Sequence, residues 1–309
     1  MTLEPRGFIE LPAHAGAGGF DHAAVHGPTR RLFVAHTAND AVDVVDLDAQ
    51  RYVGSVAGLT AVAGALVAEA PDRVFTSNRG ENTVGIFSPA AAGAADKIAV
   101  GIRPNGLAWD PGRGRLLVAH VGEPGVADSC TVSVIDVARR RRIADLVVPG
   151  RTRWAVFDPA AGVFHVNIAD PPRIVVVGAG DPVGIRRVVA VPFAGPHGLD
   201  LDVAGRRLFC ACDAGTLVEL HADHGTVLAD EPIAGAPDVV FFNPALGRVY
   251  VAIGDPGVIE VFATAPLRRR ETVPTEAGAH TLAFDASQDA VYALLPATHR
   301  AAVYADRAQ

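Results

Sequence analysis

The chain has 309 residues, of which 50% are hydrophobic and 20% charged, so it carries enough apolar material for a large core. Its formal net charge of −7 argues against a nucleic-acid-binding protein, because the phosphate backbone demands a basic surface. No stretch approaches the roughly 18 uninterrupted apolar residues of a membrane span, and the N-terminal residues lack the basic-then-apolar layout of a signal peptide.

The cysteines favour a reducing compartment. There are three of them, which is too few for a disulfide framework. Cys210 and Cys212 stand two apart in an apolar segment, so in a strand they point to opposite faces and do not bridge easily. The predicted location is the cytoplasm.

One apolar segment recurs along the chain. Its seven copies are RLFVAH (31–36), RVFTSN (73–78), RLLVAH (115–120), GVFHVN (162–167), RLFCAC (207–212), RVYVAI (248–253) and AVYALL (290–295). Each copy follows another apolar segment and a turn, as in NGLAWDPGRG (105–114), and most copies precede a further strand such as AVDVVDLD (41–48). The copies start 41 to 47 residues apart, which is the period of a four-stranded propeller blade.

The repeat predicts an all-β, seven-bladed β-propeller with four-stranded antiparallel blades, formed by residues 1–309 as a single domain. The last copy, 280–306, has room for only three strands. The segment 7–13 supplies a spare strand, and we expect it to complete that blade and close the ring. A closed ring leaves no free sheet edge from which to predict an oligomer.

Copies such as RPNGLAWDPGRGRLLVAH (103–120) with TVSVIDVARRRRIADLVVPG (131–150) resemble the YVTN-type repeats of seven-bladed bacterial propellers. The resemblance covers nearly the whole chain and implies the fold. It does not choose a function, since that family contains enzymes, metal-binding proteins and binding scaffolds.

The repeat also predicts two rings of side chains at one mouth of the central channel. In each copy the first strand ends at a turn residue, such as Asp110. The residues five positions before these turn residues form a first ring, which consists of His22, Ala63, Asn105, Arg153, His197, Asp238 and His280. The last residue of each recurring segment gives a second ring of His36, Asn78, His120, Asn167, Cys212, Ile253 and Leu295. Five of the chain's 11 histidines fall on these positions, which favours a functional site over a merely wet channel.

Histidine suits a divalent transition metal, with zinc, copper and iron as the candidates. His22 and His280 belong to the first and last blades, which become neighbours when the ring closes, and His197 lies two blades further round. We therefore predict His22, His197 and His280 as metal ligands, with Asp238 as a fourth ligand or as a group that orients them. His36 is an alternative ligand.

The remaining ring residues are candidates for catalysis and substrate binding. His120 and His36 are the predicted acid–base groups. Arg153 can hold a carboxylate or phosphate, or can pair with an acid such as Asp238. Further candidate substrate contacts are Asn105, Asn78, Asn167 and Cys212. Cys212 is equally consistent with a buried inert thiol. Trp154 follows Arg153 and is predicted to point away, into the core between blades.

Two short motifs bear on the chemistry. The stretch RPNGLAWDPGRGRL (103–116) is similar to one in gluconolactonase and senescence-marker-type propellers, which implies a divalent-metal role for Asn105 alone. The stretch GPHGLDLD (195–202) resembles the Pro-His-Gly stretches of the nitrous oxide reductase propeller, which implies a copper-binding role for His197 alone.

The leading hypothesis is a metal-dependent enzyme acting on a small anionic organic molecule. Hydrolysis or lactone opening ranks first, then elimination, then metal-centred oxidation. The alternatives are a non-catalytic propeller that binds a ligand or partner, and a copper- or zinc-binding protein.

Overall fold

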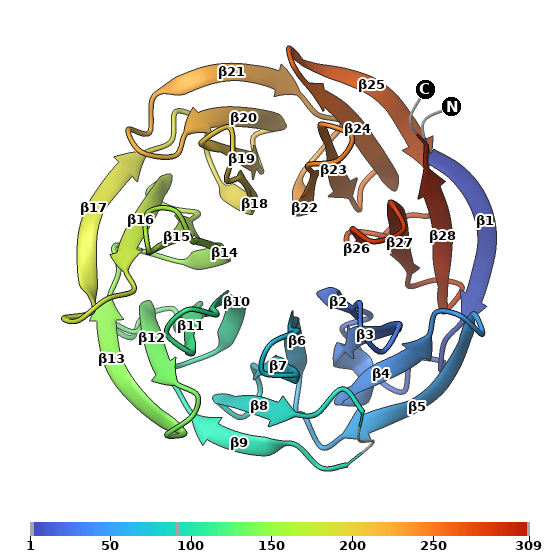
Figure 1. Cartoon of the computed structure of the whole chain (residues 1–309), viewed down its shortest axis with the longest axis horizontal. Coiled ribbons are helices and arrows are strands. Elements are labelled where there is room, and N and C mark those ends of the chain that lie inside the picture. Colours follow the sequence, from blue (N-terminus) through green and yellow to red (C-terminus); the bar gives the residue numbers. More distant parts are fainter. Residues whose placement is uncertain (1–2, 91–92, 308–309) are drawn as a thin grey trace.

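The computed structural model describes residues 3–90 and 93–307, and within these ranges the chain is a seven-bladed β-propeller (Figure 1). Its ends, residues 1, 2, 308 and 309 of the predicted domain, and residues 91 and 92 lie outside the described part. None of the described residues belongs to a helix with the length and apolarity needed to cross a bilayer.

Each blade is a four-stranded antiparallel sheet whose first strand borders the channel. Blade 1 consists of β2 (Ala23–His26), β3 (Arg31–His36), β4 (Ala41–Asp46) and β5 (Arg51–Ala57), with the 3-10 helix η1 (Thr37–Asn39) after β3. Blade 2 consists of β6 (Val62–Ala68), β7 (Arg73–Asn78), β8 (Thr83–Phe87) and β9 (Asp96–Ala99). Blade 3 consists of β10 (Pro104–Asp110), β11 (Arg115–His120), β12 (Thr131–Asp136) and β13 (Arg141–Val147).

The chain continues round the ring in the same way. Blade 4 consists of β14 (Thr152–Asp158), β15 (Val163–Ile168), β16 (Arg173–Gly178) and β17 (Gly184–Ala190). Blade 5 consists of β18 (Pro196–Asp202), β19 (Arg207–Cys212), β20 (Thr216–His221) and β21 (Val227–Pro232). Blade 6 consists of β22 (Pro237–Asn243), β23 (Arg248–Ile253), β24 (Val258–Thr264) and β25 (Leu267–Pro274).

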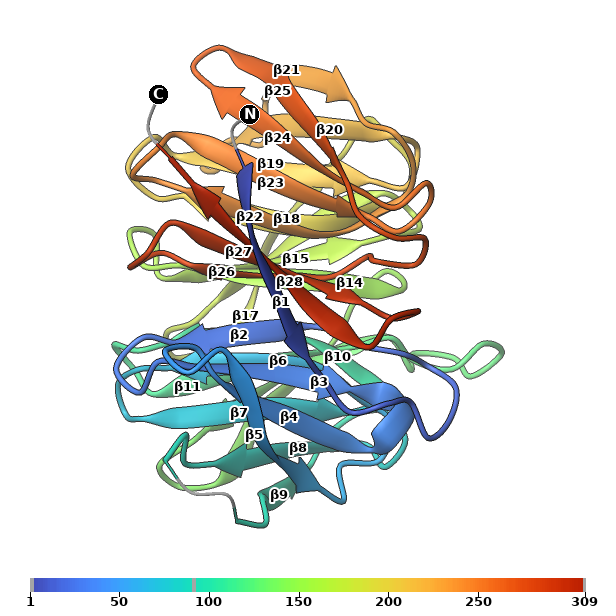
Figure 2. The same cartoon turned by 90° about the vertical axis from the view of Figure 1, so that its right-hand side faces the viewer.

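The N-terminal strand closes the ring, as the sequence predicted. Blade 7 consists of β26 (Leu282–Asp285), β27 (Ala290–Leu295), β28 (Arg300–Asp306) and, outermost, β1 (Leu3–Glu10), which pairs antiparallel with β28 (Figure 2). The predicted bounds of this strand, 7–13, were wrong. The strand starts earlier because its polar residues, such as Glu4, face solvent on the outer edge, and it ends before Pro12, which cannot donate to a ladder.

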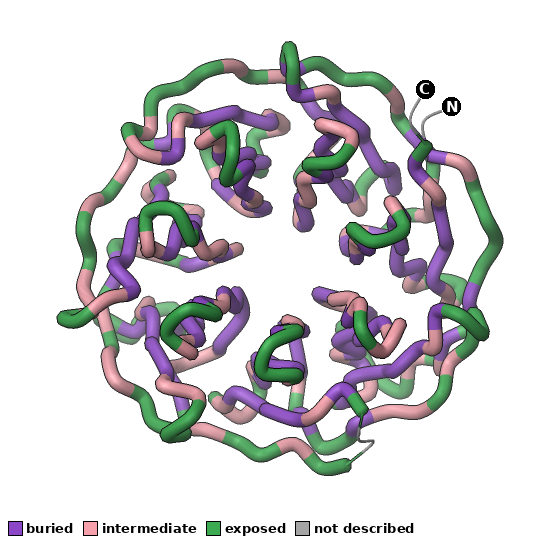
Figure 3. Tube along the Cα trace, viewed as in Figure 1, coloured by how far each residue is buried: buried purple, intermediate pink, exposed green. Residues whose placement is uncertain are grey.

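Seven apolar clusters hold the blades together, one between each pair of neighbours. At the closure, Leu32 and Val45 of blade 1 pack on Ala283 and Leu294 of blade 7. Figure 3 shows the consequence, since burial is greatest in the inner strands and alternates with exposure in the outermost ones. Each fully buried Val, Leu or Phe contributes about 1.5–3 kcal/mol, so the fold is stabilised mainly between blades.

Candidate functional site

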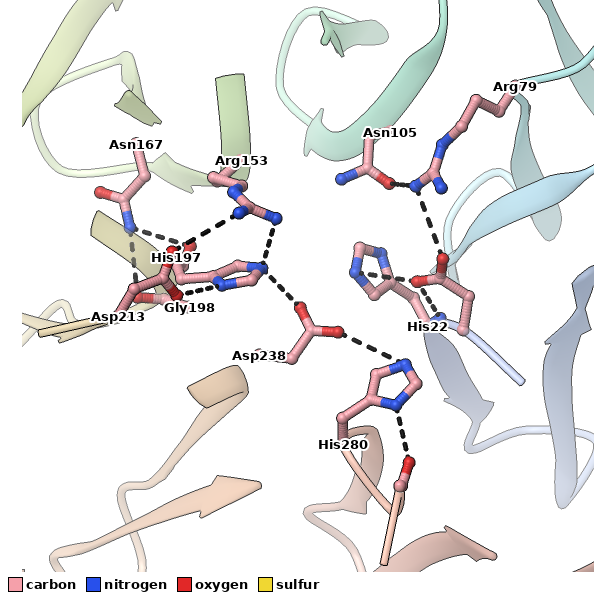
Figure 4. Close-up of polar contacts among 12 residues, drawn as sticks. His22, Arg79, Asn105, Arg153, Asn167, His197, Gly198, Asp213, Asp238 and His280 are labelled. Carbon is pink, nitrogen blue, oxygen red and sulfur yellow. Dashed lines mark hydrogen bonds and ion pairs between the residues drawn. The ribbon is translucent and has the colours of Figure 1, made fainter. Parts of the chain in front are cut away.

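Bulges at the start of the inner strands place the first ring at the channel mouth. The pairing register slips by one residue between Pro104 and Leu107 and between Pro196 and Leu199, and likewise in β14 and β22. A bulge leaves a residue unpaired and re-aims its side chain. In this way Asn105, Arg153, His197 and Asp238 point toward the middle of the ring (Figure 4).

Asn105 and His197 are each followed by a glycine. No larger residue fits there, because the neighbouring blade approaches too closely. A Cβ on Gly106 would lie 2.4 Å from the carbonyl oxygen of Arg153, and one on Gly198 would lie 2.6 Å from that of Asp238. The Asn-Gly and His-Gly pairs are therefore packing requirements of the bulge as well as features of the site.

His197 lies between two carboxylates. Its Nδ1 is 2.8 Å from Oδ1 of Asp213 and its Nε2 is 3.0 Å from Oδ1 of Asp238 (Figure 4). Burial alone would lower the pKa of His197, but the hydrogen bonds to Asp213 and Asp238 outweigh it and raise that pKa to about 9. At neutral pH the ring is therefore a cation that donates to both acids. Nη1 of Arg153 lies 3.0 Å from the same Nε2, which accepts no hydrogen bond while it is protonated. Asp213, whose Oδ2 is 3.5 Å from Nη2 of Arg153, lies between the two cations.

Asp238 is the centre of the cluster. Besides His197, its carboxylate faces His280, whose Nε2 is 3.6 Å from Oδ2. Burial would raise the pKa of Asp238, but the hydrogen bond and charge of His197, together with His22 and His280, hold it well below its usual range. An ionised, nearly buried carboxylate among imidazoles is a strong ligand for a cation.

His22 and Asp21 complete the cluster from blade 1. The His22 Nε2 is 3.3 Å from Oδ1 of Asp21, and the imidazole is 8% exposed. Burial lowers the pKa of His22, so its ring is neutral, which is the form that binds metals. One donor atom each from Asp21, His22 and Asp238 lies within 4.8 Å of the other two.

These separations fit a metal only after a small contraction. With bonds of about 2.0–2.2 Å, neighbouring donors in a tetrahedral zinc site are about 3.3 Å apart. The His280 Nε2, beside Asp238, is a possible fourth donor, because Nδ1 of that ring is held by the carbonyl of Gly278 at 2.8 Å. His197 has both nitrogens paired with acids, so in this structure it is a partner of the ligand Asp238.

The sequence-based prediction missed Asp21, Arg79 and Asp213. Asp21 comes directly before a first-ring residue. Arg79 and Asp213 come directly after second-ring residues, and both reach the mouth: Nη2 of Arg79 is 2.5 Å from Oδ1 of Asn105 and 3.5 Å from Oδ2 of Asp21. Side chains alternate at the end of a strand, so the residue one place later than predicted faces the channel.

The second ring was accordingly placed wrongly at the mouth. His36 and His120, the predicted acid–base residues, are fully buried within their blades. His36 Nδ1 is 2.6 Å from Oδ2 of Asp43, which also accepts from Ser55 at 2.6 Å. His120 contacts the hydroxyl of Thr131 at 2.9 Å, and burial lowers its pKa to about 4. Neither histidine joins the cluster around Asp238.

The predicted substrate contacts of the second ring are buried as well. Asn78 accepts from Thr76 and donates to Thr83, both at 2.9 Å. Cys212 packs in the cluster between blades 4 and 5. Asn167 has a positioning role, because its Nδ2 donates to the carbonyls of His197 at 3.0 Å and Gly198 at 3.2 Å, fixing the bulge that aims His197.

Trp154 packs against the apolar cluster between blades 4 and 5, as predicted, and it also reaches across the channel to other blades. The bulge in β14 turns it inward, so that its ring centroid is 4.2 Å from that of His22 on blade 1. On the other side it approaches Phe241, at 6.4 Å between centroids, and Phe241 in turn approaches Phe284. A series of ring contacts thus connects His22 with Trp154, Phe241 and Phe284, and this apolar surface next to His22 lowers the local dielectric.

Comparisons with known proteins support the fold alone. No protein-family model matches the chain, and no curated protein is recognisably similar in sequence, so the YVTN-type resemblance stays a prediction. Hydrazine synthase of Kuenenia stuttgartiensis contains a similar chain, with TM-score 0.82 and 14% identity over 94% of this chain and 97% of that one. A chain in the crystal structure of a mitotic checkpoint complex has TM-score 0.82 and 12% identity over 98% of this chain and 92% of that one.

Proposed function

We propose that the protein is a metal-dependent enzyme that acts on a small anionic organic molecule at the channel mouth. The observation that carries the proposal is the convergence of Asp21, His22 and Asp238, with their donor atoms within 4.8 Å of one another. Two arginines, Arg79 and Arg153, stand beside this group. The carboxylates and the imidazole would hold a metal that polarises one end of a substrate. The two guanidiniums would hold a negative group of the same substrate.

The donor set favours zinc, iron or copper. Imidazole and carboxylate are both ligands that zinc and iron accept, and His280 would add a second imidazole to His22, Asp21 and Asp238, whereas calcium prefers oxygen alone. The exposed His280 stands where a fourth ligand or a substrate would approach, since 37% of its side chain is accessible. Such a metal polarises a carbonyl or lowers the pKa of a bound water.

The chain's own groups supply the rest of the chemistry. Arg153 and Arg79 bind an anionic group of the substrate, and Asn105 orients it. His197 sits against Asp238, with Nε2 3.0 Å from Oδ1, so it is placed as the acid–base group beside the ligands. This replaces His36 and His120 in the acid–base role. Hydrolysis or lactone opening fits this combination best, with elimination and oxidation behind it.

Metal content and turnover test the proposal separately. Purified protein is analysed by elemental mass spectrometry and titrated with zinc, iron(II) and copper(II), alongside His22→Ala, Asp21→Asn and Asp238→Asn. The surface variant His224→Ala is the matched histidine control. We expect one metal per chain in the wild type and the control, and a loss of affinity of at least tenfold in the three site variants.

Turnover is then measured in a pH-stat on carboxylated lactones and esters. Metal binding without turnover on any of them would favour the metal-binding protein over the enzyme. No metal in the wild type after incubation with each ion would overturn the proposal and leave an anion-binding propeller, the function that the neighbouring arginines support by themselves.

A further inference from the structure

Two further arginines lie beside the channel mouth without a partner. Arg103 and Arg151 directly precede the inner strands of blades 3 and 4, each two residues before a first-ring residue. Neither guanidinium forms an ion pair or a hydrogen bond with any side chain in the part of the chain that the structure describes. An arginine that folding leaves unpaired next to a site is free to bind an anionic ligand bidentately.

Both arginines line one cavity of about 380 Å³, formed by the loops of blade 3 and the segment that connects it to blade 4. Its outer wall is the loop between β11 and β12, which includes Gly122, Ser129 and Cys130. A volume of this size matches the lower range of small-molecule sites, which begins at about 300 Å³. Glu123 and Asp128 also line the cavity, and neither reaches Arg103 or Arg151 to form an ion pair.

The arginines of the cavity lie close enough to those of the channel mouth for their charges to interact. Burial lowers the pKa of Arg151, and the guanidiniums of Arg153, Arg103 and Arg79 lower it further, which reports four cations close together. Arg79 forms an ion pair with Asp21 and Arg153 with Asp213, whereas Arg103 and Arg151 form none within the described residues, although the charge of Asp213 acts on Arg151 as well. The four arginines therefore stand near one another between the channel mouth and the cavity.

We infer that Arg103 and Arg151 form a second anion subsite, so that the substrate carries two negative groups, carboxylate or phosphate. One group lies at Arg79 and Arg153 beside the metal ligands, and the other lies in the cavity on the loops of blade 3. That the substrate carries two negative groups rests on the proposed function. That the protein binds a ligand with two negative groups can be measured without any metal.

The test is an affinity series in EDTA. Dicarboxylates from malonate to adipate are titrated by calorimetry against monocarboxylates of the same carbon number. We expect at least one dicarboxylate to bind tenfold or more tightly than its matched monocarboxylate. Arg103→Gln and Arg151→Gln should each weaken that dicarboxylate at least fivefold and change the monocarboxylate less than twofold. The exposed Arg268, on the outer strand of blade 6, provides the control Arg268→Gln. Comparing succinate with 3-phosphonopropionate distinguishes carboxylate from phosphate as the second group.

Cys130 reports whether the ligand enters the cavity. It lines the cavity and is partly exposed, whereas Cys210 and Cys212 are fully buried. The preferred dicarboxylate should slow alkylation of Cys130 by iodoacetamide, measured on its peptide by mass spectrometry, at least threefold.

Equal affinity for mono- and dicarboxylates, or unchanged affinity in both arginine variants, would overturn the inference even if the protein binds a metal. Conversely, selective dicarboxylate binding in a protein that binds no metal would retain the subsite and refute the proposed enzyme.

Discussion

The positive charge on His197 should make the unfolding free energy of the protein depend on pH, and the size of this dependence can be predicted. A folded-state pKa of about 9, against an ordinary value of 6.5, corresponds to about 3 kcal/mol of stability, since each pH unit between the two pKa values is worth about 1.4 kcal/mol. The folded-state pKa is the higher one, so this stabilisation is complete below pH 6.5 and is lost as the pH rises through 9. The imidazole is 14% exposed, so solvent screens little of it.

The perturbation is Asp213→Asn, which keeps the shape and an acceptor for Nδ1 but removes the charge. Because Asp213 is itself one-third exposed, part of its effect is screened, and we assign about 1–2 kcal/mol to it. Urea unfolding in EDTA from pH 6.5 to 9.5 measures the effect. The wild type should lose about 3 kcal/mol of unfolding free energy across this range, and the variant about half as much.

The control is Asp230→Asn, an exposed carboxylate on the outermost strand of the same blade that accepts no hydrogen bond from another side chain in the described structure. Its pH dependence should match the wild type. If Asp213→Asn also matched the wild type, His197 would not be held as a cation by Asp213, and its role as proton donor would have to be abandoned.

Three further outcomes follow from the packing. Gly198→Ala should lower the unfolding free energy by about 1–3 kcal/mol or more, seen as a lower Tm, because the added Cβ meets the Asp238 carbonyl at 2.6 Å. His36→Ala should cost about 3 kcal/mol, because the buried Asp43 carboxylate keeps only the hydrogen bond from Ser55, yet leave metal affinity unchanged in calorimetry. Asn167→Ala should cost about 1–3 kcal/mol in urea unfolding, because it removes the donor that fixes the His197 bulge. Lost metal binding in His36→Ala would contradict its structural role.

The sequence predicted the fold well because the repeat period is a long-range signal. Seven copies at nearly constant spacing leave little choice of architecture, and the missing strand of the last copy points to the N-terminal segment. The first ring was found for the same reason, since His22, Asn105, His197 and Asp238 occupy equivalent positions of the repeat. The structure brings them to one mouth.

The directions of individual side chains could not be read from the repeat. The bulge in β14 turns both Arg153 and Trp154 toward the channel, although strict alternation would separate them. An error of one residue at the end of the second strand exchanged Asp213 for Cys212, because consecutive side chains point to opposite sides there. Asp21 directly precedes a first-ring residue and Asp213 lies in the turn after β19, and at both positions the other copies carry different residues.

The most direct test of the central claim is anomalous diffraction from crystals soaked in zinc. We expect an anomalous peak at the channel mouth, about 2.0–2.2 Å from a nitrogen of His22 and from carboxylate oxygens of Asp21 and Asp238, with His280 as the nearest further donor. A peak only at surface histidines such as His224, or no peak at all, would contradict the metal site and the enzyme built on it.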